Sequence, residues 1–181
     1  MLKPKKKKKS LIIIHTGDGK GKTTAALGLA MRTIAHGGRV AFVQFLKNPK
    51  DYKYAVHKLE KENENLDVFT MGAGFTWETK DKAKDIKLAH ETWQKAKELI
   101  FSKKYNMVVL DEINYAIHYD FLPEEEVINL LMEKPKELHL VLTGRNATKK
   151  IIEKADLVTE MKNIKHPYKE QGISAQKGIE W

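Results

Sequence analysis

The apolar positions of the chain gather into short runs rich in β-branched residues, and more polar segments separate these runs. Uninterrupted apolar runs of this length are typical of strands that are buried on both faces, as in a parallel sheet. We expect five such strands, over residues 11–17, 39–45, 66–72, 107–113 and 139–145. A shorter run over residues 157–161 predicts a sixth strand.

Helical patterns lie between the predicted strands. Residues 22–36 are nearly all apolar or small, and residues 81–105 place one apolar stripe opposite lysines and glutamates. The residues of this stripe are Ile86, Ala89, Trp93, Ala96 and Ile100. A third helix is expected to begin at Pro123 and to end before Pro135, and a shorter one to span residues 147–155.

Strands that alternate with helices indicate right-handed crossovers and an α/β fold. We expect a mainly parallel β-sheet of five to six strands with helices on both faces, and ligands at the carboxyl ends of the strands. No internal repeat or change of composition marks a second domain, so residues 11–181 are predicted to form one domain. Its last stretch is expected to be an ordered loop or tail anchored by Ile173, Ile179 and Trp181.

Composition narrows the chemistry that the chain can perform. The 181 residues include no cysteine, which excludes disulfides, thiolate zinc sites, ligated iron–sulfur clusters and a cysteine nucleophile. No apolar run reaches the roughly 18 residues of a membrane span, and the basic start lacks the apolar stretch of a signal peptide. We therefore expect a cytoplasmic protein that does not associate with membranes, and any redox chemistry must use a bound cofactor or an outside electron donor.

The net charge of +9 is concentrated at the start of the chain. Six of the lysines, Lys3 and Lys5–Lys9, fall in residues 1–10, and these residues are expected to form a disordered basic arm. An arm that binds anions or covers a partner is the alternative. Because the rest of the chain is close to neutral, basicity is weak evidence for a nucleic-acid partner.

A glycine-rich segment, His-Thr-Gly-Asp-Gly-Lys-Gly-Lys-Thr-Thr, follows the first predicted strand and opens the first predicted helix. It matches the phosphate-binding pattern G-x-x-x-x-G-K-[ST] except that Thr16 occupies the place of the first glycine. Glycines let successive N–H groups turn toward phosphate oxygens, while a lysine adds a cation and a threonine can bind Mg²⁺. The predicted ATP-binding residues are Thr16, Gly17, Asp18, Gly19, Lys20, Gly21, Lys22, Thr23 and Thr24.

Polar residues at the ends of other predicted strands complete a candidate nucleotide site. Asp111 and Glu112 end the fourth strand, where phosphate-loop proteins place the carboxylates that face Mg²⁺, although a solvated pair of charges is the alternative. Arg145 ends the fifth strand and is predicted to contact phosphate or ribose, unless it is an ion-pair partner. Gln44 and Lys47 stand at the end of the second strand and are weaker candidates.

Several segments, taken in order, resemble the ATP:corrinoid adenosyltransferases of the bacterial cobalamin pathway. These are GDGKGKTTAALGLAMR, FVQFLK, GAGFTWET, VVLDEINYAIHYDFLPEEEVINLL, LTGRNA and KHPYKEQGISAQKGIEW. The resemblance covers residues 11–181 and implies the fold of a phosphate-loop nucleotide-binding protein. It also implies that a corrinoid reduced to Co(I) attacks the 5′ carbon of ATP, with release of triphosphate.

The resemblance assigns roles within this reaction. It implies that Lys22 and Glu112 are catalytic, and that Thr23, Glu112 and Asp111 bind Mg²⁺ or Mn²⁺ beside a triphosphate that leaves as one group. Phe75 and Trp77 would enclose the lower face of the corrinoid and exclude an axial ligand, which eases reduction of Co(II). Gly72 and Gly74 would let the backbone approach the macrocycle, although ordinary packing of this loop is the alternative.

The resemblance further implies a reduced flavodoxin-like protein or a free dihydroflavin as the electron donor, and a homodimer. Covering of the partner's site by the N-terminal segment is not expected, because that segment is mostly lysine. His166 looks like a hydrogen-bonded loop residue rather than a metal ligand. The rival functions are a phosphate-loop kinase or nucleoside-triphosphate hydrolase, which would produce ADP, and a nucleic-acid-binding ATPase that uses the lysine arm.

Overall fold

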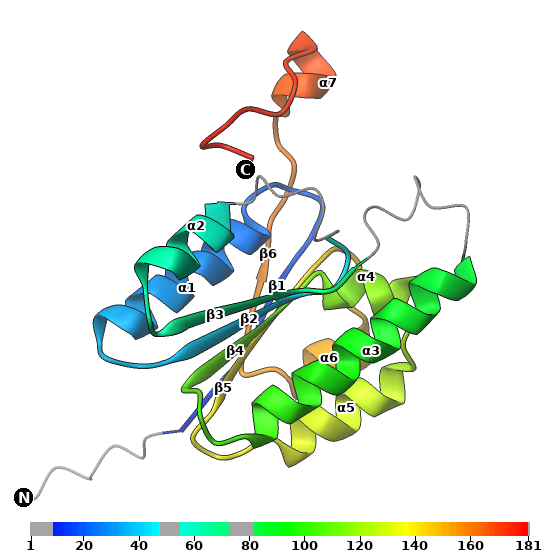
Figure 1. The fold of residues 1–181 in the computed structure, drawn as a ribbon. Coiled ribbons are helices and arrows are strands. Elements are labelled where there is room, and N and C mark those ends of the chain that lie inside the picture. The colour runs from blue at the N-terminus through cyan, green and yellow to red at the C-terminus, as the bar shows by residue number, and fades with distance from the viewer. Residues whose placement is uncertain (1–8, 48–54, 73–81, 181) are drawn as a thin grey trace, which may run out of the picture.

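The computed structural model describes residues 9–47, 55–72 and 82–180 (Figure 1). Its centre is a six-stranded sheet in which every neighbouring pair is parallel, with the order β3-β2-β4-β5-β1-β6. The strands are β1 (Ile12–Thr16), β2 (Val40–Gln44), β3 (Leu66–Thr70), β4 (Met107–Asp111), β5 (His139–Thr143) and β6 (Leu157–Glu160). The predicted α/β fold with a parallel sheet is confirmed, including the sixth strand.

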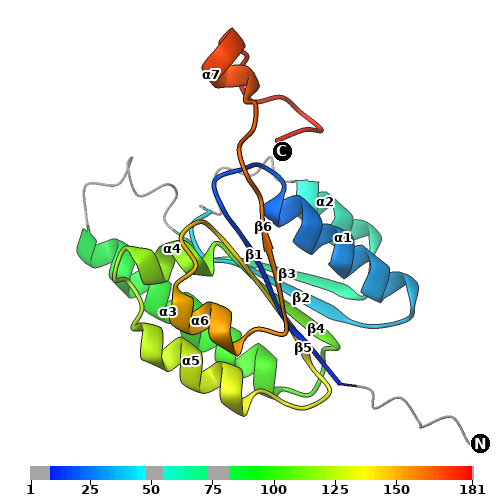
Figure 2. The ribbon, with the colours of Figure 1, turned by 180° about the vertical axis from the view of Figure 1, so that it is seen from behind.

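Helices cover both faces of the sheet (Figures 1 and 2). One face carries α1 (Lys22–Ala35) and α2 (Ala55–Glu62), and the other carries α3 (Lys82–Phe101), α4 (Ile113–His118), α5 (Glu124–Glu133) and α6 (Lys149–Lys154). Alternate residues of each strand point to opposite faces, so β1 sends Ile13 toward α1 and Ile12 and Ile14 toward the α3 side. A last short helix, α7 (Pro167–Gln171), stands apart from the sheet.

The predicted apolar stripe of α3 forms much of the core on its face. Ala89, Trp93, Ala96 and Ile100 are buried, while Ile86 at the start of the stripe is partly buried against them. The Trp93 ring is fully buried, and its Nε1 donates a hydrogen bond to Glu126 Oε2 at 3.1 Å. This polar contact satisfies the one donor that an indole would otherwise leave unpaired.

Within the described residues, the apolar pattern did not predict α2, α4 and α7, each of which has eight described residues or fewer. The predicted strand over 107–113 ends at Asp111, because Glu112 adopts a left-handed backbone (φ 65°) and α4 begins at Ile113. The expectation that apolar residues anchor the C-terminal stretch is wrong for Ile173 and Ile179, which are 38% and 64% exposed. Trp181 lies outside the described residues.

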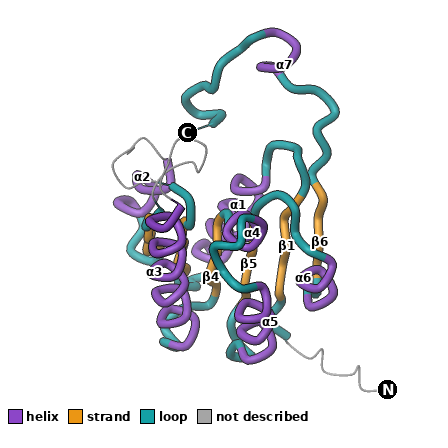
Figure 3. The backbone as a smooth tube through the Cα atoms, turned by 90° about the vertical axis from the view of Figure 1, so that its right-hand side faces the viewer, coloured by secondary structure: helices purple, strands orange, loops and turns teal. Residues whose placement is uncertain are grey.

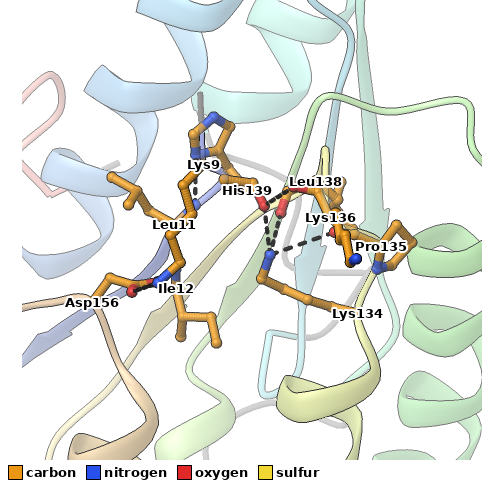
Figure 4. A network of polar contacts seen from close by, with 10 residues as sticks. Lys9, Leu11, Ile12, Lys134, Pro135, Lys136, Leu138, His139 and Asp156 are labelled. Atoms are coloured by element: carbon orange, nitrogen blue, oxygen red, sulfur yellow. Dashed lines mark hydrogen bonds and ion pairs between the residues drawn. The ribbon is translucent and has the colours of Figure 1, made fainter. Parts of the chain in front are cut away.

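Lys134 joins one side-chain hydroxyl and two main-chain carbonyl groups at the amino-terminal edge of the sheet (Figure 4). Its Nζ donates to Ser10 Oγ at 2.7 Å, to Leu138 O at 2.9 Å and to Pro135 O at 3.4 Å. Lys134 follows directly after α5, where carbonyl groups without helical partners attract a cation. The side chain thus ties the end of α5 to the start of β1.

Two further contacts hold the first residues of β1 in register (Figure 4). The Leu11 N–H donates to Nδ1 of His139 at 3.1 Å, and the Ile12 N–H donates to Oδ2 of Asp156 at 2.9 Å. Lys9 forms an ion pair with the same carboxylate.

Among the helices of the described residues, none has both the length and the apolar character needed to cross a membrane.

Candidate active site

The glycine-rich loop joins the carboxyl end of β1 to the start of α1. Gly17 (φ 91°) and Gly21 (φ 116°) have positive φ angles, which a residue with a side chain adopts only with strain. Gly21 is the N-cap of α1, so the first turn of that helix points its N–H groups toward the loop. Thr16 replaces the usual glycine and accepts a hydrogen bond at Oγ1 from the Ala147 N–H at 3.2 Å, which ties the loop to the segment after β5.

Lys22 folds back over the loop. Its Nζ donates to the carbonyl oxygens of Gly17 and Gly19, each at 2.7 Å, and the residue is only 8% exposed. Burial lowers the pKa of this ammonium, and the nearby Glu112 carboxyl opposes that change. The Lys22 ammonium is therefore hydrogen-bonded to carbonyl groups of its own loop, and phosphate oxygens of a ligand could take the place of these carbonyl oxygens.

Asp111 is fully buried at the end of β4, so the alternative of a solvated carboxylate pair is wrong for this residue. Oδ1 accepts from Thr23 Oγ1 and from Thr143 Oγ1, both at 2.8 Å. Oδ2 accepts from Gln44 Nε2 at 3.3 Å and lies 3.4 Å from Lys47 Nζ. The strand register causes this gathering, because Gln44 pairs with Asp111 across β2 and β4, and Leu110 pairs with Leu142 across β4 and β5.

Glu112 projects from a backbone that is held in a left-handed conformation. Its N–H donates to Thr143 Oγ1 at 2.9 Å, and a Cβ on Gly144 would lie 3.3 Å from its Oε2, so a glycine leaves room for the carboxylate. Oε2 is buried and has no hydrogen-bond partner among the described residues. Burial, followed by repulsion from Asp111, raises the pKa of Glu112 to about 7.

These groups border a cavity of about 510 Å³ at the carboxyl ends of the strands. Besides the residues of the loop and of α1, the cavity is lined by Phe42, Gln44, Leu46, Lys47, Ala55, Val56, Glu112, Tyr115, Arg145, His166, Gly178, Ile179 and Glu180. The structure thus brings the predicted phosphate loop, Glu112 and Arg145 to one place. Thr16 and Asp111 are buried and do not line the cavity, but Asp111 contacts the lining residues Thr23, Gln44 and Lys47.

Three residues that line the cavity, Arg145, His166 and Tyr115, differ in how far the sequence predicted their positions. Arg145 is half exposed at the rim of the cavity and forms an ion pair with Asp18, with 4.0 Å between Nε and Oδ1, so the ion-pair alternative stays open. His166 is the N-cap of α7 and accepts from the Tyr168 N–H at 3.3 Å, which confirms the expected hydrogen-bonded loop residue. Tyr115 was missed, because one tyrosine on a short helix carries no periodic signal.

Phe75, Trp77 and Gly74, the residues predicted to contact a corrinoid, lie outside the described residues. Gly72, just before them, is described and buried. A Cβ on Gly72 would lie 2.4 Å from the Phe45 carbonyl oxygen, so the close approach seen at this glycine is to the chain's own backbone.

The donors at the site fit magnesium better than a transition metal. In the part of the chain that the structure describes, no cluster of three or more histidine, cysteine, aspartate or glutamate residues could hold a metal alone. Magnesium is usually held by one or two carboxylates together with substrate phosphates. The free Oε2 of Glu112, close to Asp111 and Thr23 beside the phosphate loop, suits that arrangement.

Proteins of similar sequence include corrinoid adenosyltransferases. A sequence model of the family described as ATP:corrinoid adenosyltransferase BtuR/CobO/CobP matches residues 8–181. A corrinoid adenosyltransferase of Sinorhizobium sp. is 49% identical over 180 residues, which cover 96% of this chain and 81% of that protein. The corrinoid adenosyltransferase of Escherichia coli K12 is 39% identical over 175 residues, with 96% and 86% covered. Among solved structures, a KaiC-like protein of Pyrococcus horikoshii is similar with a TM-score of 0.49 and 16% identity, over 83% of this chain and 72% of that chain.

Proposed function

This chain belongs to the ATP:corrinoid adenosyltransferases, and on that basis we propose how its cavity carries out the transfer. The enzyme is a transferase that moves an adenosyl group to a corrinoid. In our proposal ATP lies with its triphosphate in the phosphate loop and its 5′ carbon toward the corrinoid. The observation that supports this best is the meeting of Lys22, the loop and Glu112 in one cavity.

The reaction is a displacement at carbon. The electron pair of Co(I) forms the cobalt–carbon bond, the bond from C5′ to the bridging oxygen breaks, and that electron pair leaves with triphosphate. The chain must therefore stabilise negative charge on a departing group rather than activate water. Lys22 can do this when it exchanges the carbonyls of Gly17 and Gly19 for phosphate oxygens.

We propose that Thr23 and Glu112 hold a magnesium ion, or manganese in its place, with Asp111 behind them. When bound, the ion neutralises charge on the triphosphate. Asp111 already accepts hydrogen bonds at both oxygens, so its part is to orient Thr23 and the neighbouring cations. Glu112 retains an oxygen without a partner among the described residues, and a cation bound there would stabilise the carboxylate charge that burial and Asp111 disfavour.

Arg145 and Lys20 complete the proposed triphosphate site from its rim. Both side chains are roughly half exposed, so they can reorient toward phosphate without leaving a buried position. The loop backbone, with Asp18 and Thr24 beside it, provides the remaining wall.

For the corrinoid we propose that Phe75 and Trp77 enclose the lower face of the ring and that Gly74 allows a close approach. Support comes from the resemblance of this segment to the family. Replacement of both aromatic residues by alanine should abolish reduction of bound Co(II) and spare MgATP binding. Normal Co(II) reduction by a folded double variant would contradict the assignment.

We also propose a cytoplasmic homodimer that takes electrons from a reduced flavodoxin-like protein or a dihydroflavin. The absence of cysteine supports an external electron donor. The outer strand β6 supports association, because it exposes Leu157 (44%) and Val158 (39%) at an edge of the sheet. Analytical ultracentrifugation of the enzyme and of a Val158→Lys variant would test the dimer, which should dissociate more readily in the variant.

One experiment separates the transferase from its rivals. The enzyme is incubated with MgATP and chemically reduced cobalamin, and both the corrinoid spectrum and the phosphate products are measured. We expect adenosylcobalamin and triphosphate in equal amounts, and a Lys22→Gln variant should lose at least tenfold in rate. A product mixture of ADP and orthophosphate, with Co(I) left unalkylated, would refute the proposal. No relative reported above supports a kinase, a hydrolase or a nucleic-acid-binding ATPase.

A further inference from the structure

The chain beyond β6 crosses the phosphate loop twice. We call residues 161–180 the C-terminal strap. The strap leaves the carboxyl edge of the sheet, carries α7 away from the body, and returns so that its end lies above the loop between β1 and α1 (Figures 1 and 3).

The first crossing is firmly attached. The Met161 N–H donates to Thr16 O at 2.8 Å, which extends the pairing of β6 with β1, and the Gly19 N–H donates to Met161 O at 2.6 Å. A Cβ on Gly17 would lie 2.5 Å from Met161 O, and one on Gly19 would lie 2.7 Å from Lys162 O. Two glycines of the loop are thus needed for the strap to pass, and one loop N–H donates to the strap's own carbonyl.

The second crossing is a charge contact. Glu180 forms an ion pair with Lys20, and Gly178, Ile179 and Glu180 all line the nucleotide cavity. We call residues 176–180 the tip of the strap. The tip forms a local turn, because the N–H groups of Ile179 and Glu180 donate to Gln176 O at 3.2 and 2.8 Å. The strap therefore places a carboxylate on a lysine of the phosphate loop, where a phosphate would carry the same sign of charge.

The tip can leave without disturbing the core. Every residue from Lys162 to Glu180 is exposed or partly exposed, including Ile164 (88%) and Tyr168 (65%). The Lys20 and Glu180 side chains are 42% and 32% exposed, and ion pairs that accessible contribute little to stability. A triphosphate with several charges can therefore take Lys20 from a single carboxylate.

We propose that Glu180 is a residue of the nucleotide site. It forms an ion pair with Lys20 in the ligand-free enzyme, and this ion pair breaks when Lys20 binds the triphosphate. The tip of the strap opens when a polyphosphate binds, while its base at Met161 stays attached. When triphosphate dissociates, the ion pair between Glu180 and Lys20 forms again. This proposal rests on the proposed function only in that the ligand of the loop is a polyphosphate.

Calorimetric titration with MgATP and with inorganic triphosphate tests the competition in four proteins: the full chain, Glu180→Gln, Lys20→Gln and the double variant. We expect Glu180→Gln to bind both ligands about two- to fivefold more tightly, as removal of one exposed competing pair allows. The gain should vanish in the Lys20→Gln background and shrink at high salt. Glu153→Gln, the same change at an exposed position of α6, is the matched control and should leave affinity unchanged.

The sign of the effect decides the matter. Unchanged or weaker binding by Glu180→Gln, or an equal gain in the Lys20→Gln background, would overturn the proposal, even if wild-type enzyme binds both ligands normally. Failure of wild-type enzyme to bind either ligand would overturn the proposed function as well. As a second measurement, ligand should speed tryptic cleavage after Lys177 in wild-type enzyme, and Glu180→Gln should be cleaved quickly without ligand. Equal cleavage rates throughout would also count against opening of the tip.

Discussion

Thr143 offers a sharp test of how the site is built. This residue is fully buried at the end of β5, and its hydroxyl donates to Asp111 Oδ1 at 2.8 Å and accepts from the Glu112 N–H at 2.9 Å. Valine has nearly the same shape but can make neither bond. Loss of a hydrogen bond to a charged group costs about 1.5–3 kcal/mol, and a buried N–H without an acceptor costs about 1–3 kcal/mol. Because the two losses share one site and are not additive, we expect Thr143→Val to lower the free energy of unfolding by about 2–5 kcal/mol.

The measurement combines urea unfolding with single-turnover adenosylation. Thr143→Val should also reduce the rate constant of transfer, because the Glu112 N–H then loses the side-chain acceptor that helps to fix its left-handed backbone. Thr143→Ser keeps the hydroxyl and removes one methyl group, so it should cost only about 1 kcal/mol and retain most of the rate. If the valine variant is as stable and as active as the serine variant, the hydroxyl does not organise the carboxylates and the reasoning fails.

Three further predictions follow from single contacts. The pKa of Glu112 is raised to about 7 from its ordinary 4.5, so the wild-type protein loses stability as pH rises through this interval. In EDTA, Glu112→Gln should therefore have a higher melting temperature than wild type at pH 8 but not at pH 5. A difference in melting temperature that does not depend on pH would contradict this prediction. Burial lowers the pKa of His139, so the contribution of its neutral imidazole to stability is present above pH 6.5 and is lost as pH falls through the lowered pKa. Between pH 7 and pH 5, His139→Gln should therefore lose less stability than wild type. An equal loss in the two proteins would count against this prediction. Gly19→Ala meets backbone at 2.7 Å and should destabilise the protein by about 1–3 kcal/mol and weaken MgATP binding, whereas Gly28→Ala in α1 meets nothing within 4 Å and should stabilise it slightly; similar thermal melts for the two would refute the steric argument.

The sequence predicted the structure best where apolar residues follow a regular pattern or where a motif has several characteristic residues close together. Apolar runs identified all six strands, and the stripe through Trp93 identified the buried face of α3. The phosphate loop was recognisable although Thr16 replaces its first glycine, because every other part of the motif was present. The short helices α2, α4 and α7 were not predicted, since a helix of eight residues or fewer shows barely two turns of period; of the short helices, only α6 was expected from its sequence.

The residues by themselves determined an α/β chain with one phosphate loop, a carboxylate pair at a strand end and no thiol chemistry, because these properties follow from local patterns and composition. Only the tertiary structure decided that Thr143 bridges Asp111 and Glu112, and that Glu180 reaches Lys20 from 160 residues away. Such contacts depend on strand order and register, which bring carboxyl ends together regardless of their distance along the chain. A single threonine or glutamate carries no mark of the neighbour that the folded sheet will give it.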